Sequence, residues 1–273
     1  MGKLYVVGTP IGNLGDMSPR ALETLEKVDF IAVEDTRVTI KLLNHFGIKT
    51  PMLTYQKYIE RERGAEIVSR LLGGESAAVV TDAGMPCISD PGEELVRQCA
   101  EAGVPIEVVP GPSALISALA VSGLSISRFC FEGFLSVKHN SRMDHLREIA
   151  SETRTMVFYE APHKLSATLE DMLKALGDRK IVLVRELTKM HESVFRGTVS
   201  EALSELEETP PRGEYVLIVE GAPESRGEAA PLSEAIELAR EMMADGKAAS
   251  VAAREAARLT GRHKGEIYRE LIK

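Results

Sequence analysis

The chain alternates short apolar runs with longer segments whose apolar residues recur at helical spacing. Strand-like runs recur from LYVVG (4–8) to IEVVPG (106–111), and helical segments such as 19–28 and 61–74 lie between them. Strands that alternate with helices are typical of a mostly parallel sheet with helices on its faces. We therefore predict an N-terminal α/β lobe over residues 1–122.

The pattern changes in the second half of the chain. From FCFEGFLS (129–136) to GEYVLIVEG (213–221) the strands are short, separated by hairpin-scale turns, and mixed with fewer helices. This indicates a second, unlike α/β lobe over residues 123–222. A segment rich in Pro, Gly and Ala predicts a linker over 223–231, and amphipathic helices with Gly-containing turns predict a helical tail over 232–273.

Composition narrows the class of protein. Of 273 residues, 44% are hydrophobic and 27% charged, which is ordinary for a globular protein and excludes disordered, collagen-like and coiled-coil classes. No run approaches the roughly 18 apolar residues of a membrane helix, and the start enters a strand pattern without a signal-peptide core. We expect no membrane association and a cytoplasmic protein. Cys87, Cys99 and Cys130 lack paired spacing, so we expect buried thiols and no metal site.

The charge balance bears on nucleic-acid binding. With 33 basic and 41 acidic residues the net charge is -8, and no Trp is present, which argues against a protein that coats nucleic acid indiscriminately. The average hides an uneven distribution. Residues 247–273 carry seven basic and three acidic side chains, or +4, whereas the rest carries 26 and 38, or -12. The tail could therefore bind RNA through its phosphates, or it could be a solubilising appendage or a dimer contact.

We expect two groups of candidate RNA contacts. One is the tail, and the other is a basic stretch at 138–147 that we predict to be a mobile loop beside a cleft. The candidates are Lys247, Arg254, Arg258, Arg262 and Lys264 in the tail, and Lys138 and Arg142 in the stretch.

Three loops of the first lobe follow predicted strands, at the sheet edge where α/β proteins bind ligands. GTPIGNLGD (8–16) lacks the glycine spacing of a dinucleotide fold, which argues against a standard NAD enzyme. TDAGMPCISDPG (81–92) holds more Asp, Pro and Gly than a turn requires. In VVPGPSA (108–114), Ser113 stands at a helix start, where it is either an N-cap or part of an anion site.

The motifs VGTPIGNLGD, VEDTR, TDAGMPCISDPG, VVPGPSA, FEGFL, FYEAPHKL, RELTKMHE and GEYVLIVEG resemble, in order and along almost the whole chain, the ribosomal RNA small-subunit methyltransferase I family. That family belongs to the tetrapyrrole-methylase superfamily. The resemblance implies S-adenosylmethionine as cofactor, 2′-O-methylation of a cytidine in the decoding region of 16S rRNA, two unlike α/β lobes with the cofactor in the cleft between them, and a homodimer.

The resemblance also implies cofactor contacts, position by position. Where many tetrapyrrole methylases carry an Asp late in the second loop, this chain has Gly84, and its own Asp lies two residues earlier, which leaves the role of Asp82 open. The implied contacts are Pro10, Asp82, Ala83, Gly84, Cys87, Ser113 and Ala114 in the first lobe, and Phe134, Tyr159, Ala161, Val216 and Ile218 in the second.

Methyl transfer from a sulfonium is an in-line displacement that needs alignment and no metal, but a ribose hydroxyl benefits from a base or from stabilisation of the developing alkoxide. Two polar clusters follow strands of the second lobe, and imidazole titrates near neutrality, so a His there is a plausible base. The alternative is a helix cap and a solvated turn. The candidates are Glu160, His163, Arg185, Glu186 and Lys189.

Two other functions stay open on sequence alone. One is a small-molecule methylase of the same superfamily that acts on a tetrapyrrole-like ring, although the basic tail and the RELTKMHE cluster argue against it. The other is a non-catalytic ribosome-assembly factor that senses a cofactor in the cleft. Labelled adenosylmethionine would distinguish the three functions. Label would enter RNA for an rRNA methyltransferase, a small molecule for a ring methylase, and neither for an assembly factor.

Overall fold

The computed structural model describes residues 2–223 and 230–273, apart from the side chain of Arg258. The described residues belong to two compact units, Met1–Gly221 and Ala222–Lys273. The predicted linker lies mostly outside the described residues. Each unit is treated by itself below.

A five-stranded parallel sheet organises the first half of unit 1. The order across the sheet is β3-β2-β4-β1-β5. The chain builds it from near-continuous apolar runs because a parallel sheet is covered on both faces; every residue of β2 and β4 is buried. The strands are β1 (Leu4–Val7), β2 (Phe30–Val33), β3 (Met52–Thr54), β4 (Ala77–Val80) and β5 (Ile106–Val109).

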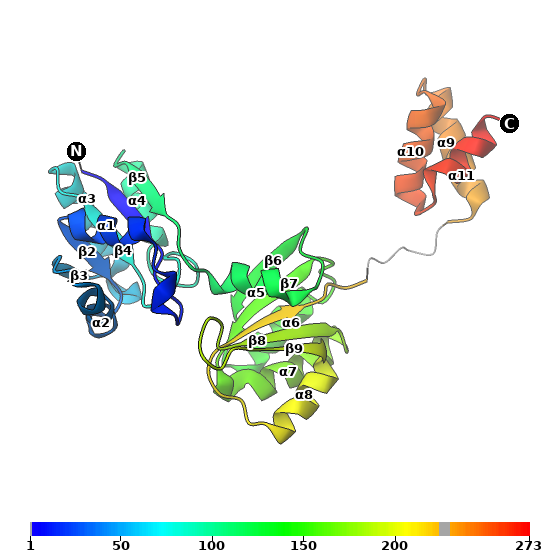
Figure 1. The fold of residues 1–273 in the computed structure, drawn as a ribbon. Helices are drawn as coiled ribbons and strands as arrows, with labels where there is room; N and C mark the ends of the chain where they lie inside the picture. Colours follow the sequence, from blue (N-terminus) through cyan, green and yellow to red (C-terminus); the bar gives the residue numbers. More distant parts are fainter. Residues whose placement is uncertain (1, 224–229) are drawn as a thin grey trace. The chain divides into compact units, whose positions relative to one another are not determined.

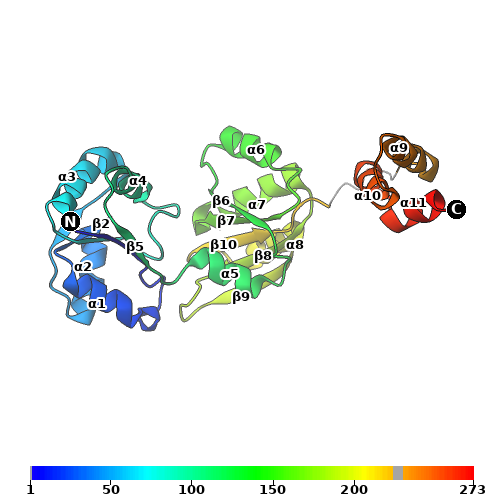
Figure 2. The same ribbon diagram turned by 90° about the horizontal axis from the view of Figure 1, so that it is seen from above.

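Helices cover both faces of this sheet (Figure 2). Leu25 and Leu43 of α1 and α2 pack on one face, and Leu71 and Leu95 of α3 and α4 pack on the other. The chain therefore leaves β1 and its neighbour β4 toward opposite faces, which makes their carboxyl ends a topological switch point, the usual ligand site of such sheets. The helices are α1 (Pro19–Lys27), α2 (Thr36–Phe46), α3 (Glu60–Leu72) and α4 (Glu93–Glu101), with short 3₁₀ turns η1 (Leu14–Asp16) and η2 (Lys57–Ile59).

A mixed five-stranded sheet organises the second half. Its order is β6-β7-β10-β8-β9, with β6 parallel to β7 and the other neighbours antiparallel. The central strand β10 is buried along its whole length. The strands are β6 (Phe129–Phe134), β7 (Thr155–Glu160), β8 (Lys180–Arg185), β9 (Ser193–Thr198) and β10 (Tyr215–Val219).

Helices α6 (His139–Glu148), α7 (Pro162–Leu176) and α8 (Val199–Glu208) cover one face of this second sheet, and α5 (Ala114–Ser122) covers the other (Figure 1). The residues 138–147, predicted as a mobile loop, instead form α6. The prediction was wrong because Leu146 is fully buried against the sheet, so the segment has an apolar side that its basic residues obscured.

Helix α5 packs on the second sheet, whereas the sequence analysis placed residues 114–122 in the first lobe. Ala118 and Leu119 are buried against Val157 and Val216. Nearly all of its side chains are apolar or small, so its periodicity revealed a helix but did not indicate which sheet it would cover. The chain thus crosses to the second sheet directly after β5.

Unit 2 is a three-helix bundle of α9 (Leu232–Ala244), α10 (Ala249–Thr260) and α11 (Lys264–Leu271). Alanines such as Ala239 and Ala253 form its core with Ile267, because small side chains let helices approach closely. Gly261, in the left-handed region, ends α10 and opens the turn to α11. The expected fold class, two unlike α/β lobes and a helical appendage, is confirmed.

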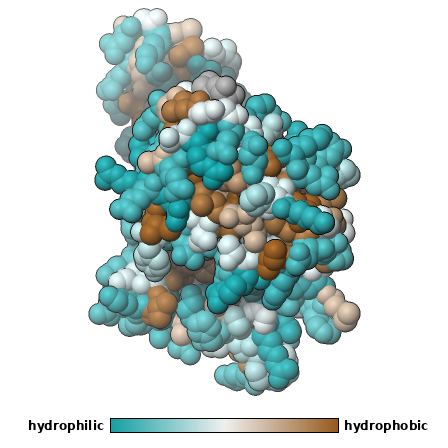
Figure 3. Space-filling model, turned by 90° about the vertical axis from the view of Figure 1, so that its left-hand side faces the viewer, coloured by the Kyte–Doolittle hydropathy of each residue, from teal (hydrophilic) through white to brown (hydrophobic). Residues whose placement is uncertain are grey.

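Polar side chains cover most of the face shown in Figure 3, and hydrophobic ones gather toward its middle. Among the described residues, no helix is both long enough and apolar enough to span a bilayer.

Candidate functional site

Three loops converge where β4, β1 and β5 end side by side. The N–H of Thr9 donates to the Gly84 carbonyl oxygen at 2.9 Å, and the N–H of Gly84 returns a bond to Thr9 at 3.1 Å. A Cβ on Gly111 would lie 2.7 Å from the Gly8 carbonyl oxygen, so only glycine permits this approach. The three predicted loops therefore form one contiguous surface at the switch point.

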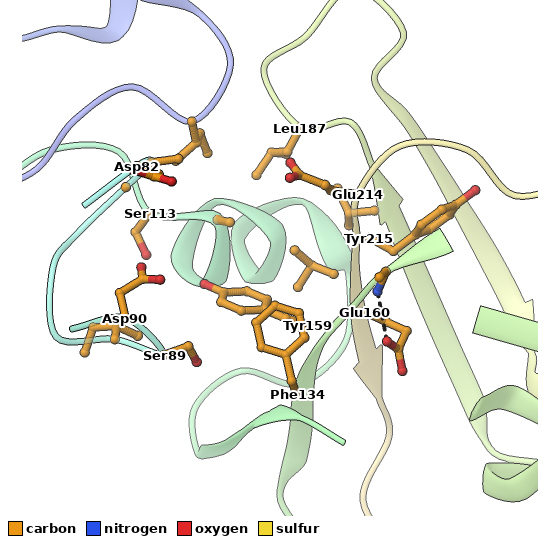
Figure 4. Close-up of a pocket in the computed structure, with 18 of the residues that line it drawn as sticks. Asp82, Ser89, Asp90, Ser113, Phe134, Tyr159, Glu160, Leu187, Glu214 and Tyr215 are labelled. Carbon is orange, nitrogen blue, oxygen red and sulfur yellow. Dashed lines mark hydrogen bonds between the residues drawn. The ribbon is translucent and has the colours of Figure 1, made fainter. Parts of the chain in front are cut away.

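A cavity of about 520 Å³ opens beside these loops, a size typical of small-molecule sites. One side is the 82–90 segment with Ile11, and the start of α5 contributes Ser113 and Ala114 (Figure 4). The other side comes from the ends of β6, β7 and β10 and from Leu187 after β8. Elements of both sheets therefore enclose one site.

Aromatic side chains form the second-sheet wall. The rings of Tyr159 and Phe134 meet edge to face, 5.5 Å between centroids, and Phe131 supports Tyr159 from behind at 4.9 Å. The Tyr159 hydroxyl accepts a hydrogen bond from the N–H of Leu115 at 3.1 Å, which ties this wall to α5. Burial, with the Asp90 carboxylate nearby, raises the pKa of Tyr159, so the wall is uncharged.

The opposite wall is acidic. Burial, and then the neighbouring Asp82, raise the pKa of Asp90 to about 6. Burial also raises the pKa of Asp82, and of Glu34 at the end of β2, where the Asp82 charge contributes as well. These carboxylates repel one another. The wall therefore favours a ligand that brings positive charge or hydroxyl donors.

Most of the residues expected to contact a cofactor line this cavity, but three do not. Pro10 lines a smaller, neighbouring cavity. Cys87 packs against the core of the first lobe, and burial raises the pKa of its thiol to about 11. Ile218 is fully buried between β10 and α5, so the expected contact through its side chain is wrong. Those that line the cavity are Asp82, Ala83, Gly84, Ser113, Ala114, Phe134, Tyr159, Ala161 and Val216.

Ser113 has one of the two roles that the sequence left open, and its position permits the other. Its hydroxyl accepts from the N–H of Ile116 at 3.5 Å and so caps α5, and the same residue lines the cavity. The capping role is therefore present, while the anion-binding role depends on a ligand.

Glu160 is unsuited to act as the predicted base. It is 3% exposed, and its carboxylate accepts from the Ala161 N–H at 2.9 Å (Figure 4). It also accepts from the Thr168 hydroxyl at 2.6 Å and from Lys164 Nζ at 2.8 Å. With its acceptors occupied, it anchors the start of α7. His163 is exposed and lies outside the cavity lining, so the proposal of a base there is corrected as well.

One residue of the RELTKMHE cluster, Leu187, lines the cavity. Lys189 Nζ contacts Glu186 Oε1 at 2.9 Å and Glu214 Oε2 at 3.0 Å, and Glu214 itself lines the cavity. Burial acts to lower the pKa of Lys189, but the two carboxylates outweigh it and the net shift is upward. Lys189 therefore stays protonated between the two carboxylates and cannot act as a base. Arg185 donates to the Arg212 carbonyl oxygen at 2.9 Å and braces the same turn.

The Lys189 side chain also contacts the first glycine-rich loop. A Cβ on Gly12 would lie 2.5 Å from Lys189 Cγ and 3.1 Å from the Thr188 hydroxyl. Thr188 and Glu186 both adopt positive φ, which a side chain tolerates only at a cost. The turn is therefore shaped to cover the loop between β1 and α1.

Arg142 is not available to RNA phosphates, which corrects its assignment. It is 6% exposed, and its guanidinium bonds Asp171 at 2.7 Å and 2.9 Å and the Ser136 carbonyl oxygen at 3.1 Å. It holds the segment before α6 against α7. Lys138, at the N-cap of α6, is exposed.

The tail candidates differ in exposure. Arg254 and Lys264 are exposed. Lys247 forms an ion pair with Glu255, and Arg262 donates to the Ala230 carbonyl oxygen at 2.7 Å. The side chain of Arg258 lies outside the described residues.

Sequence reasoning missed several cavity residues. Asp90 was recognised only as part of the 81–92 loop. The available signal was its position in that loop between Pro86 and Pro91. Nothing local indicated Glu214, because its role depends on Lys189, which lies 25 residues earlier in the chain.

Relatives with similar sequences carry one name. A protein from Synechocystis sp. named ribosomal RNA small subunit methyltransferase I is 48% identical over 270 residues, covering 98% of this chain and 96% of its own. A protein of the same name from Thermotoga maritima is 49% identical over 221 residues, which cover 81% of this chain and 99% of the relative.

Solved structures share the fold over about four fifths of the chain. A uroporphyrin-III-C-methyltransferase from Thermus thermophilus superposes with a TM-score of 0.56 at 23% identity, covering 81% of this chain and 94% of its own. A diphthine synthase superposes at 0.61 and 15% identity, covering 81% and 90%. Residues 3–203 match the family described as Tetrapyrrole (Corrin/Porphyrin) Methylases. The chain is therefore a methyltransferase that belongs to the tetrapyrrole methylase family, in its ribosomal RNA small subunit methyltransferase I branch.

Proposed function

We propose that this chain transfers a methyl group from S-adenosylmethionine to the ribose 2′-hydroxyl of a cytidine in the decoding region of 16S rRNA. The names of the relatives support the RNA substrate. The observation that carries the proposal is the cavity at the switch point, which is acidic on one wall and aromatic on the other. We propose that the reaction takes place in the cytoplasm.

The residues of the cavity suit S-adenosylmethionine. The donor is a cation at sulfur and at its amino group, and the carboxylates of Asp82 and Asp90 would hold these charges or the ribose hydroxyls. Phe134, Tyr159 and Ile11 offer an apolar surface for the adenine ring. When bound, the donor supplies a methyl group that is already activated, so the protein mainly has to align the acceptor.

The chain's own residues would then orient the acceptor and exclude water. Lys189 stays protonated between Glu186 and Glu214, so it can stabilise negative charge that develops on an attacking oxygen but cannot remove its proton. We propose that the acidic wall supplies the proton acceptor, because burial raises the pKa of the Asp82 and Asp90 carboxyl groups.

The test is methyl transfer with tritiated S-adenosylmethionine and small ribosomal subunits from a strain that lacks this protein. We expect label in RNA, on the ribose of one cytidine located by mass mapping of nuclease fragments. Free 16S rRNA, run in parallel, tells whether the assembled subunit is required. Label in an added tetrapyrrole instead of RNA would support the small-molecule alternative, and no transfer to either would support a non-catalytic role.

We also propose that unit 2 contributes to RNA binding through exposed cations such as Arg254 and Lys264. The Thermotoga maritima relative matches over 221 residues and 99% of its length, which leaves no room for a segment of this size. We therefore propose that unit 2 is an accessory to the methylase core. A homodimer is proposed from the resemblance, and light scattering on the purified protein tests it.

A further inference from the structure

A second cavity of about 290 Å³ lies next to the first, within the first lobe. The loop after β1 contributes Pro10, Gly12 and Leu14, and α2 contributes Val38 and Thr39. Leu14 and Val38 are apolar yet 42% and 39% exposed, so they flank an open mouth and not a closed core. Of the residues that the resemblance assigns to the cofactor, only Pro10 and Asp82 line this cavity, and Asp82 lines the larger one as well.

The two cavities share a thin partition. Ile11 lines the larger one, while Pro10 and Gly12, on either side of it, line the smaller one. Likewise, Ala83 lines the larger and Thr81 the smaller. The partition is therefore the pair of loops joined by the bridge between Thr9 and Gly84. Asp82 lines both cavities, so this residue lies where ligands in the two would meet.

Thr39 is an independent sign that the smaller cavity binds something. It is 3% exposed, lines the cavity, and its hydroxyl has no hydrogen-bond partner among the described residues. An unpaired buried hydroxyl destabilises a fold, and a valine of the same shape would avoid that cost. A ligand that exchanges a hydrogen bond with Thr39 explains why the hydroxyl is there.

The chemistry of the walls limits the ligand. Pro10, Val38 and Leu42 provide apolar surface, Thr39 one hydrogen-bonding group, and Lys41 a positive charge on the exposed side of α2. A flat heterocycle with polar edges and an attached phosphate matches this combination. The cavity is smaller than the donor site, in keeping with one base and its sugar.

We propose that this second cavity holds the single unstacked nucleotide that is methylated, with its ribose hydroxyl hydrogen-bonded to Asp82 at the junction of the two cavities. The inference rests on the proposed function and deepens it by placing the acceptor. As the new bond forms between the ribose oxygen and the methyl carbon, the bond from that carbon to sulfur breaks with its electron pair going to sulfur, and the hydroxyl proton passes to the Asp82 carboxylate.

Two residues of α2 give a matched test. Val38 and Ile40 are 39% and 38% exposed, but only Val38 lines the cavity. We expect Val38→Trp to raise the KM for small subunits at least about tenfold because its indole fills the cavity. We expect its affinity for S-adenosylmethionine, measured by calorimetry, to stay within about twofold of wild type. Ile40→Trp should leave both quantities unchanged.

Thr39→Val provides a second test, which does not depend on the size of the substituted side chain. Loss of one hydrogen bond to the acceptor should raise KM about fivefold, while the melting temperature stays equal or rises. If subunits that wild type methylates are bound equally well by Val38→Trp and Thr39→Val, the cavity is not the acceptor site, although the proposed function stands. If the wild type labels no RNA at all, the proposed function fails first, and this inference fails with it.

Discussion

Thr9 and Gly84 exchange two backbone hydrogen bonds, of 2.9 Å and 3.1 Å, across the gap between β1 and β4. This short antiparallel bridge joins two loops that leave a parallel sheet toward opposite faces. It fixes the partition between the two cavities mainly through the backbone, and the Thr9 hydroxyl adds contacts to the Thr81 and Gly84 carbonyl oxygens at 3.4 Å and 3.5 Å. The site therefore depends on backbone conformation as much as on the residues that face a ligand.

Gly84 should be sensitive to substitution for two separate reasons. Its φ is +84°, and a Cβ would lie 3.2 Å from Ile11 and 3.6 Å from the Pro112 carbonyl oxygen. We expect Gly84→Ala to cost about 1 kcal/mol of unfolding free energy and to weaken S-adenosylmethionine binding, measured by calorimetry. Gly47 has φ +73° with no atom within 4 Å, so Gly47→Ala is the control. It should cost similar stability and leave cofactor affinity unchanged; equal loss of affinity in both would contradict the prediction.

Asp90 should make the protein less stable as pH rises. Its pKa is about 6 in the folded protein, above the 3.8 of a free aspartate. Between these values the folded state binds more protons than the unfolded state, so the free energy of unfolding falls as pH increases through this window. Asp90→Asn should therefore be more stable than wild type at pH 7.5, by about 1–2 kcal/mol after allowance for partial exposure, and equal to it near pH 4.

Urea unfolding of both proteins at several pH values checks this prediction. A variant that is less stable than wild type at pH 7.5 would show that the Asp90 carboxylate is stabilised by its surroundings. The same variant should bind S-adenosylmethionine more weakly, because the charge on the acidic wall is reduced.

Arg142 should matter for stability and not for RNA affinity. Arg142→Met leaves the Asp171 carboxylate, 2% exposed, without its main partner, although His139 still contacts it at 3.0 Å. We expect a loss of about 3 kcal/mol in chemical denaturation. Lys138→Ala, at an exposed position in the same segment, should stay within about 0.5 kcal/mol. A weaker salt dependence of RNA binding in folded Arg142→Met would restore the original assignment.

Removal of unit 2 should separate RNA affinity from cofactor affinity. A protein ending at Gly221 retains the whole of unit 1, so its S-adenosylmethionine affinity and melting temperature should match those of the full chain. Its affinity for small subunits should fall, and the dependence on salt should become shallower, because phosphate contacts are lost.

In the full-length protein, the double variant Arg254→Gln with Lys264→Gln should reproduce part of this effect. Glu237→Gln, an exposed change of the opposite sign in the same unit, serves as control and should not weaken binding. An unchanged salt dependence on deletion of unit 2 would exclude it as an RNA contact.

Several contacts within unit 1 could not be predicted from local patterns. The pairing of Lys189 with Glu214 and its position over Gly12 join three segments that are distant in sequence. The burial of Arg142 depends on Asp171, 29 residues away, which neutralises a charge that looked like an RNA contact. The amino-acid composition does not reveal whether a partner is close. A buried arginine such as Arg142 is therefore easily mistaken for a surface cation.

The strands, most of the helices, the two α/β halves, the helical tail and the loops that form the site could be predicted from the sequence, since each depends on periodicity and on residues adjacent in the chain. Helix α6 could not, because its basic residues hid its apolar side. Folding alone determines which sheet α5 covers, that hydrogen bonds occupy the Glu160 carboxylate, and that Asp82 lines two cavities. These depend on burial and on charges brought together by folding, and burial is a property of the packed chain as a whole.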